Sequence, residues 1–261
     1  MRLPVLLYHH VGPSRPGTFP ELTVSVERFE RHVQWLVRRG YVGIRPSDWL
    51  AWRRDGTPLP QKPVLLTFDD AYADLARHAL PVLRRHEFGA VIFVVTGCIG
   101  GENRWDQARG SRSHRLMTAD QIREWAACGV EFGAHSRTHP DLTTLSRRDL
   151  DWEVRGSRDD LAEVTGLAVP SFAYPFGRTN EAVQDCVRSA FECAFSCVQG
   201  TNSRSSDPHS LRRSIVQPHD SALALTCRVR FGRYPAHEWR AHLRIRSRLR
   251  ATAGRLLRSE R

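Results

Sequence analysis

The chain alternates short apolar runs with segments of helical periodicity along most of its length, and this alternation constrains its fold more than any other feature. The apolar, strand-like runs lie at residues 3–8, 64–68, 90–95, 130–134, 171–174, 194–198 and 214–217. The helical patterns lie between them, at residues 25–40, 71–86, 118–128, 149–165 and 181–190. Because each helix returns the chain to the start of the next strand, consecutive strands run parallel. The pattern predicts an α/β fold with a parallel sheet wound by helices, and the number of units favours closure into a barrel.

Length and composition are those of an ordinary globular protein. The 261 residues suffice for one large α/β domain, and 41% hydrophobic with 26% charged residues is typical of a soluble protein. No window approaches the roughly 18 apolar residues of a membrane-spanning helix, and the apolar run at residues 3–8 is too short for a signal-peptide core. None of the six cysteines lies in a Cys-x-x-Cys pair, which favours reduced thiols. We therefore expect a cytoplasmic protein.

The net charge of +11 is concentrated at the C-terminal end. From Arg228 to Arg261 there are eleven arginines against two glutamates, so this segment alone carries +9. We divide the chain into a main domain at residues 1–227 and an Arg-rich, helical tail at residues 228–261. A basic amphipathic helix suits peripheral contact with an anionic membrane, and a solvated tail is the alternative. Nucleic acid is not an expected partner, because the arginines are confined to one terminus, and the oligomeric state is left open.

Two polar runs follow strand-like segments directly, where α/β folds usually mount their chemistry. Residues 67–70 read Thr-Phe-Asp-Asp, and residues 135–139 read His-Ser-Arg-Thr-His. Either run alone has a simpler interpretation, as a helix cap or as satisfied polar contacts. Together they offer two carboxylates and two imidazoles, which suit one divalent metal and one base. With Asp70, His135 and His139 as ligands, Asp69 stays free to accept a proton from water.

Four motifs in order resemble those of the polysaccharide deacetylase (NodB-homology) family, the metal-dependent carbohydrate esterases, over about residues 5–216. The aspartate run resembles the first motif and the histidine run the second. Residues 172–177, Phe-Ala-Tyr-Pro-Phe-Gly, resemble the third, which shapes one wall of the substrate groove. Residues 7–11, Leu-Tyr-His-His-Val, resemble the Tyr-His-x-Val start of one large subgroup.

The resemblance implies a fold, a reaction and a set of roles. The family fold is a distorted (β/α) barrel of about seven parallel strands. In the family, the residue at the place of Asp69 is the catalytic base, and those at the places of Asp70, His135 and His139 bind the metal. Tyr174, Pro175 and Phe176 are expected at the substrate, and Trp105 is a further candidate for stacking on a sugar.

Three departures from the family pattern affect the expected site. Ala71 stands where the family usually has glycine, and Ala173 stands where many members carry an arginine that orients the catalytic aspartate. The late motif with a general-acid histidine is matched only loosely by residues 214–220. His219 is one candidate for the acid, although it also reads as an exposed loop histidine, and His9 is its rival.

The expected function is metal-dependent hydrolysis of the linear, non-peptide amide bond of an N-acetylated sugar or glycan. Zn²⁺ is the expected ion, with Co²⁺, Ni²⁺, Mn²⁺ or Fe²⁺ as alternatives. Two other functions stay open: a catalytically silent carbohydrate-binding relative, and an amidohydrolase or esterase acting on a non-sugar substrate. The sequence does not say whether the glycan is polymeric, nucleotide-linked or lipid-linked.

Overall fold

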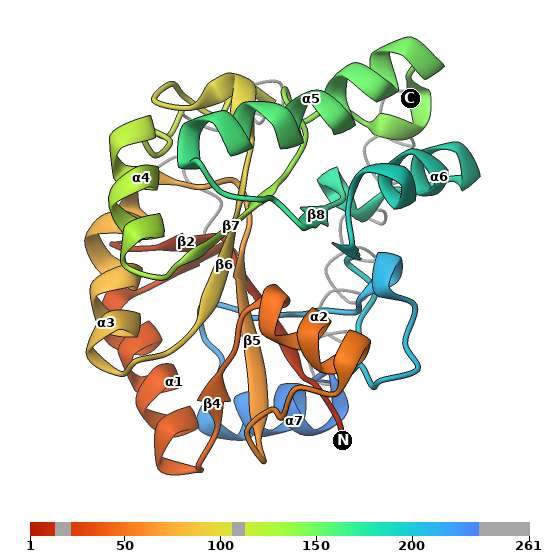
Figure 1. The fold of residues 1–261 in the computed structure, drawn as a ribbon. Helices are drawn as coiled ribbons and strands as arrows, with labels where there is room; N and C mark the ends of the chain where they lie inside the picture. Colours follow the sequence, from red (N-terminus) through yellow and green to blue (C-terminus); the bar gives the residue numbers. More distant parts are fainter. Residues whose placement is uncertain (14–21, 106–112, 235–261) are drawn as a thin grey trace, which may run out of the picture.

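A curled parallel sheet forms the centre of the protein in the computed structural model, which describes residues 1–13, 22–105 and 113–234 (Figure 1). The sheet has the strand order β10-β1-β5-β6-β7-β8-β9, with β4 paired to β5, and every pair is parallel. Its strands are β1 (Val5–Tyr8), β4 (Val42–Gly43), β5 (Pro63–Phe68), β6 (Ala90–Val94), β7 (Glu131–Ala134), β8 (Ser171–Ala173), β9 (Cys193–Phe195) and β10 (Ser214–Ile215). The expected distorted barrel of about seven parallel strands is thus confirmed.

Helices surround this sheet. They are α1 (Val26–Arg38), α2 (Pro46–Asp55), α3 (Leu80–Arg85), α4 (Ala119–Ala127), α5 (Arg147–Thr165), α6 (Glu181–Ala190) and α7 (Ala222–Phe231). Strands β2 (His10–Val11) and β3 (Thr23–Val24) form a small separate pair. The caps are those that the sequence indicates, since Ser25 accepts from the Arg28 N–H and Thr118 forms a capping box with Gln121.

The helix expected at residues 71–86 begins later than its periodicity indicates. Regular helical structure starts with a π-helical turn, η2 (Leu75–Ala79), and continues as α3. Asp70 and Ala71 have positive φ angles of 73° and 52°, which do not fit a right-handed helix. Pro81 lacks an N–H and cannot donate to a preceding carbonyl, and the Leu80 N–H bonds to Leu75 five residues back.

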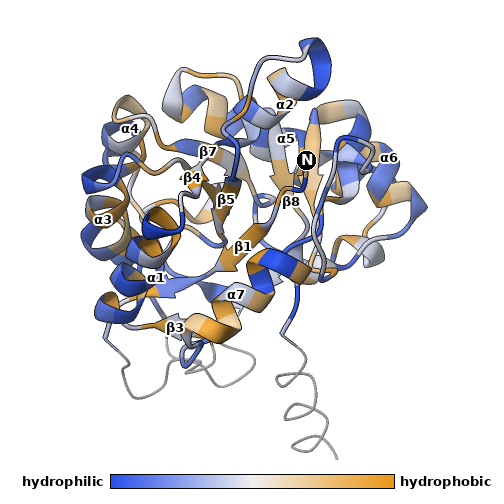
Figure 2. Ribbon diagram, turned by 90° about the horizontal axis from the view of Figure 1, so that it is seen from below, coloured by the Kyte–Doolittle hydropathy of each residue, from blue (hydrophilic) through white to orange (hydrophobic). Residues whose placement is uncertain are grey.

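The strands separate two hydrophobic cores. Alternate residues of β5 and its neighbours, Leu65, Val91 and Phe93 among them, pack inside the barrel. The residues between them, such as Leu66 and Ile92, pack outward against the helices. Figure 2 accordingly shows β1 and β5 in hydrophobic colours, whereas the surrounding helices mix both kinds of residue. This period-two alternation decides which residues reach the interior at the strand ends.

Helix α7 crosses the domain boundary that the sequence suggests after Cys227. Arg228 is buried and forms an ion pair with Asp220, so the ordered body extends at least to Phe231. The helical tail expected beyond it falls on residues 235–261, outside the described residues.

Within the described ranges, no helix has the length and apolarity needed to cross a bilayer. All six cysteines fall in these ranges and are free thiols, as the sequence indicates.

Candidate active site

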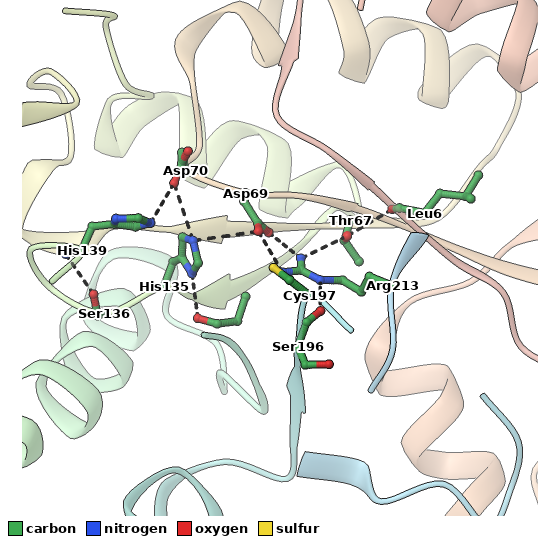
Figure 3. Close-up of polar contacts among 11 residues, drawn as sticks. Leu6, Thr67, Asp69, Asp70, His135, Ser136, His139, Ser196, Cys197 and Arg213 are labelled. Atoms are coloured by element: carbon green, nitrogen blue, oxygen red, sulfur yellow. Dashed lines mark hydrogen bonds and ion pairs between the residues drawn. The ribbon is translucent and has the colours of Figure 1, made fainter. Parts of the chain in front are cut away.

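The two polar runs meet at the carboxyl ends of β5 and β7, which flank β6 in the sheet (Figure 3). Asp69 and Asp70 follow β5 directly, and His135 follows β7. Both strands are buried and parallel, so their carboxyl ends open on the same end of the barrel. The structure therefore brings together residues that are separated by about 65 positions in the chain.

Asp70, His135 and His139 form the one possible metal site among the described residues, and all three are buried. Their ligand atoms lie within 4.8 Å of one another. The Asp70 Oδ1 atom is 3.6 Å from His135 Nε2 and 3.5 Å from His139 Nε2. Ligands at about 2.0–2.1 Å from a tetrahedral zinc ion lie roughly 3.3–3.4 Å apart. The spacing of the three donors therefore fits a small divalent ion between them.

Both histidines are prepared to bind a metal as neutral imidazoles. Burial lowers the pKa of His135, although Asp69 opposes this, and burial together with His135 lowers the pKa of His139 well below its usual value. The His135 Nδ1 atom lies 2.7 Å from the Ala173 carbonyl oxygen. Because a carbonyl can only accept, Nδ1 carries the proton and the lone pair of Nε2 faces Asp70.

The backbone is strained where the site is built. Six residues other than glycine have positive φ in the described ranges, and five of them are at this site. These five are Asp70, Ala71, Ser136, His139 and Phe176. Such conformations cost about 1–3 kcal/mol each and persist only where the surroundings enforce them. At position 71, a φ of 52° explains why glycine would be the easier residue.

Asp69 is held by an arginine that the sequence did not single out. The Arg213 guanidinium donates two hydrogen bonds to it, Nη1 to Oδ1 at 2.6 Å and Nη2 to Oδ2 at 2.9 Å. Burial alone would raise the pKa of Asp69, but Arg213 and His135 outweigh it and bring the pKa to about 2. Asp69 is therefore ionised at neutral pH, with both oxygens fixed.

Arg213 supplies the positive charge beside Asp69 that many family members have at the place of Ala173. It lies directly before β10, is fully buried in the barrel interior, and also contacts the Ser196 carbonyl and the Thr67 hydroxyl. The sequence contained only a weak signal for it, an arginine in the alternation Leu211, Arg213, Ile215. Ala173 is accordingly compatible with an oriented base.

The loop that carries the two histidines is fixed by Glu153 of α5. One Glu153 oxygen accepts the Arg137 N–H at 2.8 Å and the Thr138 N–H at 2.9 Å, and the other accepts the Thr138 hydroxyl at 2.5 Å. Ser136 accepts the His139 N–H at 3.0 Å. Glu153 is buried on the apolar stripe of α5, and a carboxylate at such a position was the sequence signal for its role.

Aromatic residues form a wall around His139. Trp105 stacks on its ring at a centroid distance of 4.7 Å, and Phe176 meets it edge-on at 4.5 Å. Both side chains are partly exposed, whereas Pro175 is buried. The expectation that Tyr174 stacks on a sugar is wrong, because its ring is buried and its hydroxyl donates to the His209 carbonyl at 2.9 Å.

The two candidate acids differ in their surroundings. His9 leaves the carboxyl end of β1 half-buried, and burial lowers its pKa to about 4, although Asp69 raises it. Arg213 and His135 also lower the pKa of His9, so charged groups of the site influence its ring directly. His219 is exposed in the turn after β10.

Comparison with known proteins places the chain in a family. Residues 56–190 match the family model for polysaccharide deacetylases. A Bacillus subtilis protein named as a polysaccharide deacetylase, YxkH, is 28% identical over 225 residues, which are 85% of this chain and 74% of that protein. Poly-β-1,6-N-acetyl-D-glucosamine N-deacetylase of Staphylococcus aureus is 23% identical over 74% of this chain and 68% of that protein.

Solved structures agree in fold. The Streptococcus pyogenes deacetylase PplD in complex with acetate superposes with a TM-score of 0.75, at 25% identity over 87% of this chain and 97% of that chain. IcaB from Ammonifex degensii superposes with a TM-score of 0.69, at 26% identity over 83% of this chain and 92% of that chain. With the motifs, the fold and the family match in agreement, this chain belongs to the polysaccharide deacetylase family.

Proposed function

We propose that this protein removes N-acetyl groups from a glycan by metal-dependent hydrolysis, at the site formed by Asp69, Asp70, His135 and His139. The observation that carries the proposal is the convergence of three metal-ligand atoms beside an ionised carboxylate that is not needed as a ligand. The names of the relatives, which include an N-deacetylase of poly-β-1,6-N-acetyl-D-glucosamine, support a glycan amide as the substrate.

Asp70, His135 and His139 would hold the ion, and Zn²⁺ is the ion that we propose, since two imidazoles and one carboxylate in a tetrahedral spacing suit it. When bound, the ion supplies Lewis-acid polarisation of the acetyl carbonyl and makes water more acidic. Three protein ligands leave room for water and for substrate.

Asp69 accepts the proton of the attacking water in this proposal. Arg213 holds both carboxylate oxygens, so Asp69 stays ionised, with its Oδ2 3.9 Å from Nε2 of the ligand His135. The nitrogen that leaves must gain a proton, and His9 is better placed than His219 to donate it because its ring interacts with Asp69 and His135. His9 is neutral in the resting site, so it first has to gain the proton that it passes on.

Trp105 and Phe176 are the residues that we expect against a sugar face. They flank His139 and are partly exposed, and aromatic rings pack well on the apolar faces of sugars. Tyr174 acts in this scheme only through packing behind the site.

Acetate release tests the proposal. Protein stripped with a chelator is reloaded with Zn²⁺, Co²⁺, Ni²⁺, Mn²⁺ or Fe²⁺ and assayed on N-acetylglucosamine oligomers, peptidoglycan fragments and small N-acetyl amides. Activity on sugars that returns with the metal supports the proposal. No activity supports a silent carbohydrate-binding relative, and activity only on the small amides supports a non-sugar amidohydrolase.

Asp69→Asn separates the base from the ligands. We expect it to lower kcat by about 10²–10⁴-fold while one metal ion still binds per chain. Asp185→Asn, an exposed aspartate of α6, is the matched control and should behave like the unaltered protein. Asp69→Asn with unchanged kcat would contradict the assignment of the base.

We further propose, from the sequence alone, a cytoplasmic enzyme whose Arg-rich tail contacts an anionic membrane. Liposome flotation of the full chain and of a chain ending at residue 234 tests this contact. We expect only the full chain to float with anionic vesicles, and equal flotation of the two would exclude a role of the tail.

A further inference from the structure

A polar cavity opens at the same end of the barrel as the metal site. Its volume is about 310 Å³, which is at the lower end of small-molecule sites. Its walls come from the segments that follow β1, β5 and β6, which are neighbours in the sheet. The residues that matter here are His10, Asp74, Arg77, His78, His114 and Arg115.

Tyr72 packs on the lining residue His10 and lies close in the chain to the metal site. Tyr72 comes two residues after the ligand Asp70, and its ring stacks on that of His10 at 3.6 Å. Asn103 lies 3.4 Å from the Tyr72 hydroxyl, and Trp105 of the same segment stacks on the ligand His139. Tyr72 is buried, and its contacts link the lining residue His10 to the segments next to the metal ligands.

Within the described ranges, two arginines and one aspartate line the cavity. Among the described residues, Asp74 is the one acidic group of the lining; its Oδ2 is 2.7 Å from His10 Nδ1, whereas its buried Oδ1 has no hydrogen-bond partner in the described ranges. Arg77 is exposed and makes no ion pair within the part of the chain that the structure describes. Arg115 is 4.0 Å from Glu102, a weak and exposed contact. Arginine forks in such a setting recognise phosphate and carboxylate groups.

The cavity is not a second metal site. The described residues contain a single group of convergent ligand atoms, that of Asp70, His135 and His139. Two arginines in the wall would also repel a cation. Arg77 and Arg115 are the groups of the wall that an anion would pair with.

We propose that this cavity is an anion subsite, which takes a phosphate or carboxylate group carried by the N-acetylated glycan while the acetamide lies at the metal. This substrate class rests on the proposed deacetylase function. The substrate is then an anionic glycan, either phosphorylated or containing a uronic acid, rather than a neutral homopolymer.

A binding experiment tests the cavity without turnover. Zinc-loaded protein with ¹³C-labelled histidines is titrated at constant ionic strength with inorganic phosphate and, separately, with glucuronate, and the ring signals of His78 and His114 are followed. We expect chemical-shift changes that saturate with anion concentration. The Kd obtained from them should rise about tenfold in Arg77→Gln, because one charge-assisted hydrogen bond is lost. Arg38→Gln is the matched control, since Arg38 is exposed in the last turn of α1. The anion that saturates identifies the source of the charge, and shifts that do not saturate, or that are equal in Arg77→Gln, overturn the subsite.

A kinetic experiment tests the substrate class. Acetate release is compared for a neutral N-acetylglucosamine tetramer, a tetrasaccharide alternating glucuronate with N-acetylglucosamine, and a nucleotide diphosphate of N-acetylglucosamine. We expect the kcat/KM ratio of the preferred anionic probe to the neutral one to fall about tenfold in Arg77→Gln and to stay unchanged in Arg38→Gln. An unchanged ratio in Arg77→Gln overturns the proposal. If no probe releases acetate, the proposed function fails, and the binding experiment still decides on the cavity.

Discussion

Replacement of Glu153, which touches no metal and no expected substrate, should weaken metal binding. Its carboxylate accepts the backbone N–H groups of Arg137 and Thr138 and the Thr138 hydroxyl, and it thereby fixes the loop between His135 and His139. Ser136 and His139 in that loop have positive φ angles of 63° and 60°. A strained loop relaxes when its supports are removed, so the two imidazoles would no longer be held at the spacing that suits the ion.

The expected size of the effect follows from the number of hydrogen bonds lost. Glu153→Ala leaves two buried N–H groups and a hydroxyl without an acceptor, each at a cost of about 1–3 kcal/mol. Loss of supporting residues around metal ligands typically weakens binding by about 10–100-fold, which corresponds to about 1.4–2.7 kcal/mol. Glu153→Gln retains one oxygen for the two N–H groups, so we expect no more than about a tenfold loss.

Competition with a chromophoric chelator measures the Zn²⁺ dissociation constants of the apo proteins. Glu163→Gln is the control, because Glu163 lies exposed on the same helix α5. Thermal unfolding with and without Zn²⁺ gives a second readout, in which stabilisation by the metal should shrink in the order unaltered protein, Glu153→Gln, Glu153→Ala.

A folded Glu153→Ala variant that binds Zn²⁺ as tightly as the unaltered protein would refute this reasoning. If Glu153→Ala does not fold, Glu153→Gln decides, since it keeps the shape of the side chain. If Glu163→Gln weakens Zn²⁺ binding by the same amount, the reasoning is also refuted, because the effect would then come from the charge of helix α5 and not from the loop.

Two further predictions concern Asp69 and Ala71. Arg213→Gln removes the cation that lowers the pKa of Asp69 to about 2, so this pKa should rise and the acid limb of kcat/KM should move to higher pH, as a pH–rate profile would show. Because the pKa of Asp69 lies below its usual 3.8, its ionised form contributes stability above that pH, and this contribution is lost as the pH falls toward 2. In Arg213→Gln this acid-induced loss of stability should disappear. An unchanged pH–rate profile in Arg213→Gln would contradict the pairing. Ala71→Gly relieves a φ of 52° and should stabilise the fold by up to about 1 kcal/mol, or raise Tm by about 2–4 °C. A lower Tm for Ala71→Gly would show that position 71 is not strained.

The parts of the site that local patterns encode could be predicted from the sequence. Asp70 and His135 each follow the end of a strand with a clear apolar run, His139 lies four residues beyond His135, and parallel strands place their carboxyl ends together. Helix α6 has the predicted bounds, since Asn180 caps it and its apolar residues follow one period.

The missing parts depend on contacts between distant segments. Arg213 lies 144 residues from Asp69, and β10, which begins beside it, has only two residues. Nothing local indicates that its side chain crosses the barrel interior. The prediction for Tyr174 failed for a related reason, because an aromatic residue in a substrate motif can face either the groove or the core. Its N–H donates to the carbonyl of Phe195 in β9, and its ring is buried.

The backbone explains why two adjacent aspartates have different roles. Asp69 continues the alternation of β5, in which Leu65 and Thr67 also face the barrel interior, and it therefore meets Arg213. Asp70 would face outward in a regular strand, toward the helices. Its φ of 73° ends the strand instead and turns the carboxylate sideways to the end of β7, where His135 and His139 lie. The division between base and ligand is therefore set by strand register, and deletion of one residue in β5 would exchange the direction of both carboxylates.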